Sequence, residues 1–211
     1  MFPCNNKCIN QQSSSKMMNI ILLGLPGSGK STHGKKIAEK YGLYYLESGE
    51  IFRKKAKKDT ETGRELKKYL NQGKLVPDAT VKEVMAQEIE ENIQTKGFVF
   101  DGFPRTSEQA QFLDKLLQEK GTSVHIIIHL KINKDQAKKR IVEKRRKEED
   151  RVEDKSDELV ENRIKNQEET IRELTEYYEK RIKPFEYDAT GTIEIIQEAI
   201  DEVISMKQDN T

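Results

Sequence analysis

Residues 24–31 read Gly24-Leu25-Pro26-Gly27-Ser28-Gly29-Lys30-Ser31. They match the pattern G-x-x-x-x-G-K-[ST], which is typical of a phosphate-binding loop. The glycines let successive backbone N–H groups turn toward phosphate oxygens, where larger side chains would obstruct them. Lys30 adds a full positive charge, and the Ser31 hydroxyl can reach a bound Mg²⁺. A chance glycine turn with an incidental lysine would give the same letters, so the flanking sequence decides between the two interpretations.

The flanking sequence favours phosphate binding. Residues 19–23 form a short apolar run, which predicts a strand buried on both faces. Residues 31–40 follow with helix-forming residues, and Ile37 and Ala38 stand at helical spacing. The loop therefore joins a buried strand to the start of a helix. The N-terminus of that helix carries about half a positive charge and faces the same anion.

Further along the chain, short apolar runs alternate with helical segments. Strands are expected at residues 19–23, 43–46, 97–101 and 124–130, with a last strand and turn within 184–196, and helices at 31–40, 50–80, 81–95, 108–119, 134–183 and 197–206. Within 134–183 the apolar residues fall on one helical face: Ile164, Ile171, Leu174, Tyr178 and Ile182. This alternation predicts an α/β fold with a parallel sheet and helices on both faces.

Composition excludes several classes of protein. The 38 Lys and Arg residues against 37 Asp and Glu residues give a net charge of +1, which argues against a nucleic-acid binder held by bulk charge. No apolar run approaches the roughly 18 residues of a membrane helix. The two cysteines, Cys4 and Cys8, stand near the start, which excludes a disulfide-built secreted fold and favours a cytoplasmic location. Residues 1–17 are polar without a signal-peptide pattern, and we expect a flexible tail.

Two further clusters bear on the phosphate chemistry. Asp101 ends an apolar strand and opens the string Asp-Gly-Phe-Pro-Arg-Thr-x-x-Gln over residues 101–109. An Asp at that place can order Mg²⁺ and its waters beside the phosphate loop, although it can also be a simple cap or turn residue. The second cluster is a series of arginines: Arg140, Arg145, Arg146, Arg151 and Arg163. Such a series is usually a solvated helix face, but beside a phosphoryl donor it can neutralise the transferring charge.

These motifs together resemble the adenylate kinase family. The phosphate loop is followed in the family's order by Ser48-Gly49-Glu50-x-x-Arg53, residues 73–77 (Gly-Lys-Leu-Val-Pro), the string at 101–109 and residues 151–154 (Arg-Val-Glu-Asp). The resemblance runs from about residue 18 to residue 206. It implies the P-loop nucleoside monophosphate kinase fold, a five-stranded parallel sheet with a helical NMP-binding insert and a short lid. The implied parts are a core at 18–46, 77–139 and 164–211, an NMP-binding region at 47–76 and a lid at 140–163.

The resemblance also implies an activity, the reversible transfer of the γ-phosphoryl group of MgATP to AMP to give two ADP. The residues implied for ATP are Gly27, Ser28, Gly29, Lys30, Ser31, Thr32 and Arg140. Those implied for AMP are Ser48, Arg53, Lys74, Val76, Gly102, Arg105 and Gln109, with Gln109 at the adenine edge. The implied catalytic set is Lys30, Arg105, Arg140, Arg151 and Arg163. Mg²⁺ is implied at Ser31 and Asp101, partly through water, and the turn at 188–191 is implied at the donor base.

Some positions depart from the family pattern. His33 replaces a Gln, Ser48 replaces a Thr, and Glu50 replaces an Asp. Glu at that last position is common in the related uridylate and cytidylate kinases, so a UMP/CMP kinase is the alternative. Those kinases carry Asn at the positions of Thr106 and Gln109, so we expect AMP to be the acceptor.

The stretch between Arg140 and Arg163 is short and lacks cysteines, so we expect no structural zinc. Either Lys144 or Arg145 fills one further cationic position implied on the lid side. A switch-like hydrolase is disfavoured because the guanine-reading string N-K-x-D is absent. We expect ATP and AMP as the partners, no nucleic acid or membrane, and a monomer.

Overall fold

The fold is described from a computed structural model, over residues 17–72, 75–145 and 156–209. In that part of the chain, one parallel sheet has the strand order β2-β3-β1-β4-β5. Its strands are β1 (Met18–Gly24), β2 (Tyr44–Glu47), β3 (Gly97–Asp101), β4 (Ile126–Lys131) and β5 (Phe185–Asp188). The helices are α1 (Lys30–Tyr41), α2 (Ser48–Ala56), α3 (Glu61–Asn71), α4 (Asp78–Glu91), α5 (Ser107–Glu119), α6 (Lys134–Arg145), α7 (Asp157–Tyr178) and α8 (Ile193–Asp209). The predicted α/β class and five-stranded parallel sheet are confirmed.

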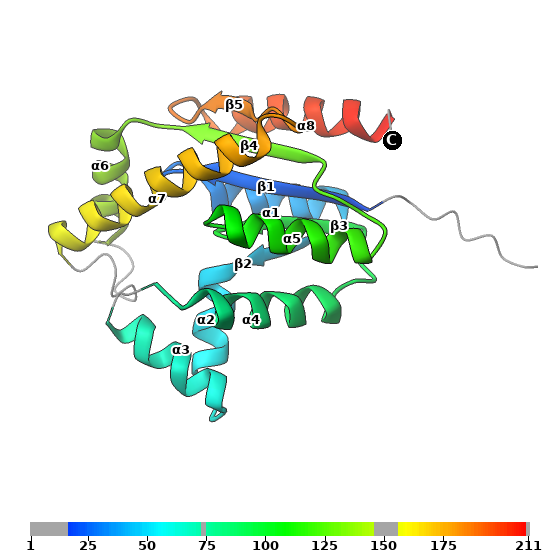
Figure 1. Ribbon diagram of the computed structural model, residues 1–211. Coiled ribbons are helices and arrows are strands. Elements are labelled where there is room, and N and C mark those ends of the chain that lie inside the picture. Colours follow the sequence, from blue (N-terminus) through cyan, green and yellow to red (C-terminus); the bar gives the residue numbers. More distant parts are fainter. Residues whose placement is uncertain (1–16, 73–74, 146–155, 210–211) are drawn as a thin grey trace, which may run out of the picture.

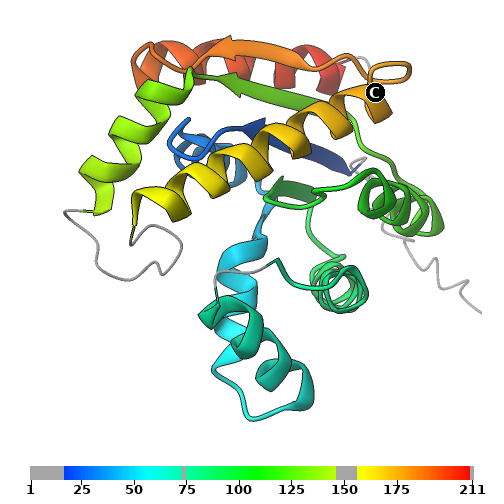
Figure 2. The same ribbon diagram turned by 60° about the vertical axis from the view of Figure 1, so that its left-hand side comes forward.

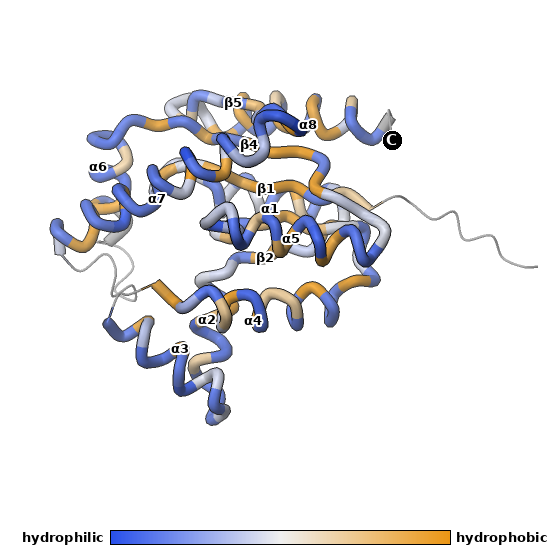
Figure 3. Tube along the Cα trace, in the orientation of Figure 1, coloured by the Kyte–Doolittle hydropathy of each residue, from blue (hydrophilic) through white to orange (hydrophobic). Residues whose placement is uncertain are grey.

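Helices cover both faces of the sheet, as Figure 1 shows. On one face, Ile21 and Leu23 of β1 pack with residues of α4, α5 and α7. On the other face, Ile20 and Leu22 pack with residues of α1 and α8. Because alternate residues of a strand point to opposite faces, a strand between two helical layers is apolar on both faces along most of its length. Strands β1 and β4 are accordingly the hydrophobic centre of the molecule in Figure 3.

The strand register brings the carboxyl ends together. Glu47 at the end of β2 pairs with Asp101 at the end of β3, and Asp101 pairs with Leu22 near the end of β1. On the other side, Lys131 of β4 pairs with Asp188 of β5. All five loops that follow the strands therefore start from one edge of the sheet, where open α/β sheets bind their ligands.

Helices α2 and α3 extend away from the sheet in Figure 2. The sequence predicted one helical region at 50–80, but the structure divides it at Lys57–Thr60, and α4 begins already at Asp78. Thr60 is the N-cap of α3, because its side chain accepts a hydrogen bond from the Gly63 N–H at 3.0 Å. A cap of this kind starts a new helix even within a charged, helix-forming stretch.

Helix α8 begins earlier than the sequence predicted. Residues up to 196 were expected in a strand and turn, yet the helix starts at Ile193. The Thr192 carbonyl accepts from the Ile196 N–H at 3.2 Å, and the Thr192 hydroxyl accepts from the Ile195 N–H at 3.4 Å. The β-branched residues suggested a strand, but this capping outweighs their weak intrinsic preference.

Two expectations concern the periphery of the fold. Most of the predicted tail, including Cys4 and Cys8, lies outside the described residues, while Met17 packs against the core. Among the helices that the structure describes, none combines the length and apolar character needed to cross a membrane.

Asn19 joins three segments at the opposite end of the sheet from the strand carboxyl ends. Its side chain is fully buried and donates to Thr122 Oγ1 at 3.0 Å and to the Ser123 carbonyl at 2.8 Å. Its Oδ1 accepts from the Phe98 N–H at 3.2 Å. The backbone N–H of Asn19 donates to His125 Nδ1 at 3.1 Å. Each group is satisfied, so the cluster stabilises the start of β1 without an unpaired polar atom.

We predict that Asn19→Ala lowers the free energy of unfolding by about 2–4 kcal/mol, because the buried Phe98 N–H loses its partner. Urea denaturation measures the change. Ser123→Ala is the control, since Ser123 contributes its backbone carbonyl and not its side chain to this cluster. Equal stability of the two variants would contradict the role given to Asn19.

Candidate functional site

The phosphate loop turns between β1 and α1 as the sequence predicted. Gly27 has φ 83° and Gly29 has φ 93°, in the left-handed region that favours glycine. Gly29 is also the residue before α1, so the loop ends at the positive end of that helix. A Cβ on Gly27 would lie 3.1 Å from the Ala137 carbonyl oxygen, so α6 packs closely on the loop.

Ser28 provides an unused hydrogen-bonding group inside the loop. The residue is buried, and among the described residues its Oγ has no hydrogen-bond partner. Buried hydroxyls are nearly always bonded, so an orphan of this kind calls for a partner from outside the chain. An oxygen of a bound phosphate is an acceptor that suits this place beside a helix N-terminus.

The ammonium group of Lys30 donates to two carbonyls of the loop, Gly24 O at 2.7 Å and Leu25 O at 3.1 Å. Burial lowers the pKa of Lys30 to about 8; Asp101 acts in the opposite direction, and the positive charges of Arg163 and Arg105 lower it further. Asp101 belongs to β3, Arg163 to α7 and Arg105 to the loop after β3. The charges that act on this one ammonium group therefore come from three parts of the chain.

Asp101 faces the phosphate loop from the end of β3. It is buried, and its Oδ2 accepts from Ser31 Oγ at 3.0 Å and from the Tyr45 hydroxyl at 2.7 Å. The two oxygen ligands predicted for Mg²⁺ are therefore adjacent, and oxygen donors suit this cation. Tyr45 was not identified from the sequence. It reaches Asp101 across α1 because Gly34 has no side chain; a Cβ there would lie 2.5 Å from the Tyr45 ring.

Arginines approach the loop from α6 and α7. Arg140 donates to the Gly27 carbonyl at 3.2 Å. Arg163 is partly exposed on α7, and its charge reaches Lys30. Arg151 and Lys74 lie outside the described residues, as do the side chains of Lys144 and Arg145, so the structure does not place these predicted cations.

His33, which stands where the resemblance expects Gln, places its ring between Gly29 of the loop and helix α8. It is buried, and its Nδ1 lies 2.9 Å from Gln197 Oε1 of α8. Gln197 in turn donates to Asp201, which also binds Lys40 and Tyr41 of α1. This departure from the family pattern is therefore part of a polar connection between α1 and α8.

A second group of predicted residues meets beyond the ends of β2 and β3. Ser48 Oγ donates to the Gly102 carbonyl at 2.8 Å, and Arg105 Nε donates to the same carbonyl at 2.9 Å. Arg53 lies 3.5 Å from Glu47, a partly buried carboxylate that the sequence analysis did not select. The position of Glu47 at the end of β2 was the sequence signal that could have identified this residue.

Gln109 is held by two hydrogen bonds of its side-chain amide. Its Oε1 accepts from the Arg105 N–H at 2.9 Å, and its Nε2 donates to Asp78 Oδ1 at 2.6 Å. Asp78 was not predicted as a site residue, because the sequence analysis included it among the charged residues of the helical region expected at 50–80. Val76, two residues earlier, is partly buried against the core, and Thr32 is exposed at the start of α1.

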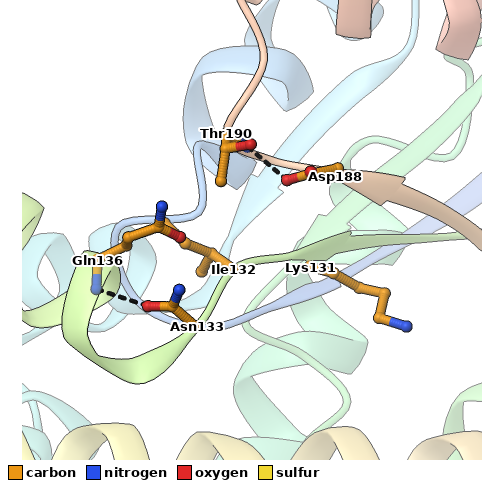
Figure 4. Close-up of a pocket in the computed structure, with 6 residues that line it drawn as sticks. All are labelled: Lys131, Ile132, Asn133, Gln136, Asp188 and Thr190. Carbon is orange, nitrogen blue, oxygen red and sulfur yellow. Dashed lines mark hydrogen bonds between the residues drawn. The ribbon is translucent and has the colours of Figure 1, made fainter.

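A cavity of about 510 Å³ lies beside the turn at 188–191, and Figure 4 shows it between this turn and the start of α6. Its lining residues are Lys131, Ile132, Asn133, Gln136, Asp188 and Thr190. Hydrogen bonds from Thr190 lower the pKa of Asp188, and the charge of Arg140 contributes to this shift. Arg140 therefore donates a hydrogen bond to the phosphate loop, and its charge also lowers the pKa of Asp188 in the turn that the resemblance implies at the donor base.

No cluster of three or more His, Cys, Asp or Glu side chains suited to a metal occurs within the residues that the structure describes. His125 and His129, which fall within the strand expected at 124–130, have separate partners. His125 precedes β4 and accepts from Asn19, while His129 faces Glu186 of β5 at 3.3 Å.

Comparison with known proteins places this chain in a family. The family model for adenylate kinases matches residues 22–183. The adenylate kinase of Flavobacterium psychrophilum is 39% identical over 189 residues, which cover 90% of this chain and 99% of that protein. The adenylate kinase of Flavobacterium johnsoniae is 38% identical over 188 residues, covering 89% and 98%. That of Azobacteroides pseudotrichonymphae is also 38% identical over 188 residues, covering 89% and 97%. The family indicated by the sequence motifs is confirmed, and the chain belongs to the adenylate kinase family.

Proposed function

We propose an assignment of residues to the adenylate kinase reaction that this chain catalyses, the reversible transfer of the γ-phosphoryl group of ATP to AMP. ATP occupies the phosphate loop, and AMP occupies the group around Gly102 and Gln109. The observation that carries the assignment is the surroundings of Lys30. The charges of a carboxylate, Asp101, and of two arginines, Arg105 and Arg163, all act on the phosphate loop lysine although they come from other parts of the chain.

On the donor side, the residues bind and neutralise phosphate oxygens. The backbone N–H groups at 27–32 and the Ser28 hydroxyl donate to them, and Lys30 supplies the charge at the β and γ positions. Phosphoryl transfer has a loose transition state with charge spread over the transferring group, so positioned cations contribute most of the catalysis. Arg105, Arg140, Arg151 and Arg163 fill this role, and no covalent intermediate on the protein is required.

Mg²⁺ belongs to the same proposal. Ser31 and Asp101 offer oxygen ligands that are 3.0 Å apart, directly or through water, and fit a small hard cation. When bound, the ion neutralises phosphate charge and orients the donor. Tyr45 donates to the Asp101 oxygen that Ser31 also contacts, so it holds the carboxylate in place.

On the acceptor side, Arg53, Lys74 and Arg105 bind the AMP phosphate, and Gln109 contacts the adenine edge. Ser48, Gly102 and Val76 complete this site. We also propose the domain assignment. Residues 47–76 form the AMP-binding region and residues 140–163 form the lid. Closure of these two regions excludes water from the transfer. We also propose that the enzyme is monomeric and cytoplasmic and has no nucleic-acid partner.

The UMP/CMP alternative is not favoured, because the relatives described above are named adenylate kinases. We predict that, in a coupled assay with MgATP, AMP is phosphorylated far faster than UMP, CMP or GMP. The reason is that the smaller ring of a pyrimidine would not reach the remaining hydrogen-bonding positions of the Gln109 amide. Faster turnover of UMP or CMP would reject the adenine site while leaving the phosphate site intact.

Lys30→Ala should lower kcat by about 10³-fold or more, since a charge on the transferring group is lost. Arg105→Ala should act in the same direction. Steady-state kinetics measure the loss, and circular dichroism verifies that the fold remains. Lys36→Ala, an exposed lysine on the same helix, serves as the control and should turn over normally. Near-normal turnover of Lys30→Ala would remove the assignment.

Asp101→Asn should raise the Mg²⁺ concentration needed for tight ATP binding by about tenfold, because a charged oxygen ligand becomes neutral. Calorimetric titration of ATP at several Mg²⁺ concentrations measures this without turnover. Asp59→Asn is the matched control, since Asp59 is exposed and pairs with Arg64 in the α2–α3 connection. An unchanged Mg²⁺ dependence would show that Asp101 has only a structural role.

A further inference from the structure

We infer that Asp78 fixes the orientation of the Gln109 amide and so determines which purine the acceptor site takes. This inference rests on the proposed function, in which Gln109 contacts the base of AMP. It adds a residue outside the predicted site and a specific discrimination, that of adenine against hypoxanthine and guanine.

The two hydrogen bonds of Gln109 allow one orientation of its amide. A backbone N–H can only donate, so the group facing Arg105 N must be the oxygen, Oε1. A carboxylate can only accept, so the group facing Asp78 must be the nitrogen, Nε2. Rotation of the amide by 180° about its terminal bond would put two donors together at Arg105 and two oxygens together at Asp78. The chemistry of the partners therefore assigns the two ends of the side chain.

Asp78 and Gln109 each lie in the first turn of a helix, and this turn fixes their positions. Asp78 is the first residue of α4, where the helix N-terminus favours a negative charge. Buried Val81 and Thr80 anchor the same turn, and the Thr80 hydroxyl donates to Glu65 of α3 at 2.9 Å. Gln109 lies in the first turn of α5, and its N–H donates to the capping Thr106 hydroxyl at 3.2 Å. Gln109 itself is buried, with an exposed fraction of 4%.

The remaining hydrogen-bonding capacity of Gln109 matches adenine. After these two bonds, Oε1 keeps one lone pair and Nε2 keeps one hydrogen. The Watson–Crick edge of adenine offers the reverse pair, a donor at the 6-amino group and an acceptor at N1. Hypoxanthine and guanine offer a 6-carbonyl and an N1–H, which would meet the fixed amide as acceptor on acceptor and donor on donor. A freely rotating amide would accept either pattern, and Asp78, together with the Arg105 N–H, prevents this rotation.

The test compares AMP with IMP, whose bases differ at these two positions. In Asp78→Ala, kcat/KM for AMP should fall about tenfold relative to that for IMP, because a charged hydrogen bond that fixes the amide is lost. KM for ATP should not change. Asp78→Asn keeps an acceptor of the same shape but can also rotate, so its AMP/IMP ratio should lie between those of the wild type and Asp78→Ala.

Lys82→Ala is the matched control. Lys82 lies one turn after Asp78 and pairs with Glu108 of α5, so it joins the same two helices without contacting Gln109. Its AMP/IMP ratio should equal that of the wild type. If Asp78→Ala lowers the melting temperature but keeps the wild-type ratio, Asp78 only joins α4 to α5 and the inference is wrong.

Gln109→Leu separates this inference from the proposed function. Loss of the AMP/IMP discrimination in Gln109→Leu, together with its reduction in Asp78→Ala, supports both. If Gln109→Leu loses the AMP/IMP discrimination but both Asp78 variants keep the wild-type ratio, Asp78 does not orient the amide. The adenine contact of Gln109 would then still stand. A wild-type ratio in Gln109→Leu would overturn the adenine contact itself, and the inference with it.

Discussion

Parallel pairing of β1 with β3, and of β3 with β2, is the constraint on which the site depends. The pairing places the ends of three strands beside one another, so that Asp101 lies next to both the phosphate loop and Glu47. Residues separated by many positions in sequence thereby surround one ammonium group. The apolar face contacts of β1 on both sides hold this register, because a shift by one residue would exchange the two buried faces.

Electrostatics at the loop follow from this placement. Besides burial, Arg163 and Arg105 lower the pKa of Lys30, whereas Asp101 and Glu47 raise it. Burial and the neighbouring arginines both lower the pKa of Lys30, although its ammonium group donates to the Gly24 and Leu25 carbonyls. In the proposed function, a phosphate at this loop adds a negative charge that stabilises the ammonium form of Lys30. The unpartnered Ser28 hydroxyl, a feature of the described part of the chain, has the same explanation.

The sequence predicted the features that are local or that follow from a motif. The phosphate loop, the parallel sheet and Asp101 at a strand end were all of this kind. Tyr45 was missed because it contacts Asp101 across 56 residues, and the gap that admits it is a glycine on a third element, α1. Asp78 was missed for a similar reason, since its only distinguishing property is a contact with Gln109, 31 residues away. The start of α8 was misplaced because composition near Ile193 favours a strand, whereas a single cap decides it.

Glu50, the departure from the family pattern that most favoured a pyrimidine acceptor, has a local explanation. Glu50 forms an ion pair with Lys54 one turn later on α2, at 2.8 Å, and its side chain is 42% exposed. The hydrogen bond from Lys54 lowers the pKa of Glu50, so this carboxylate is engaged at the surface. The groups that face the Gln109 amide come instead from Asp78 and from the backbone of Arg105. If Gln109 contacts the acceptor base as proposed, acceptor choice depends on the hydrogen bonds of Gln109, and the acidic residue at position 50 is compatible with AMP.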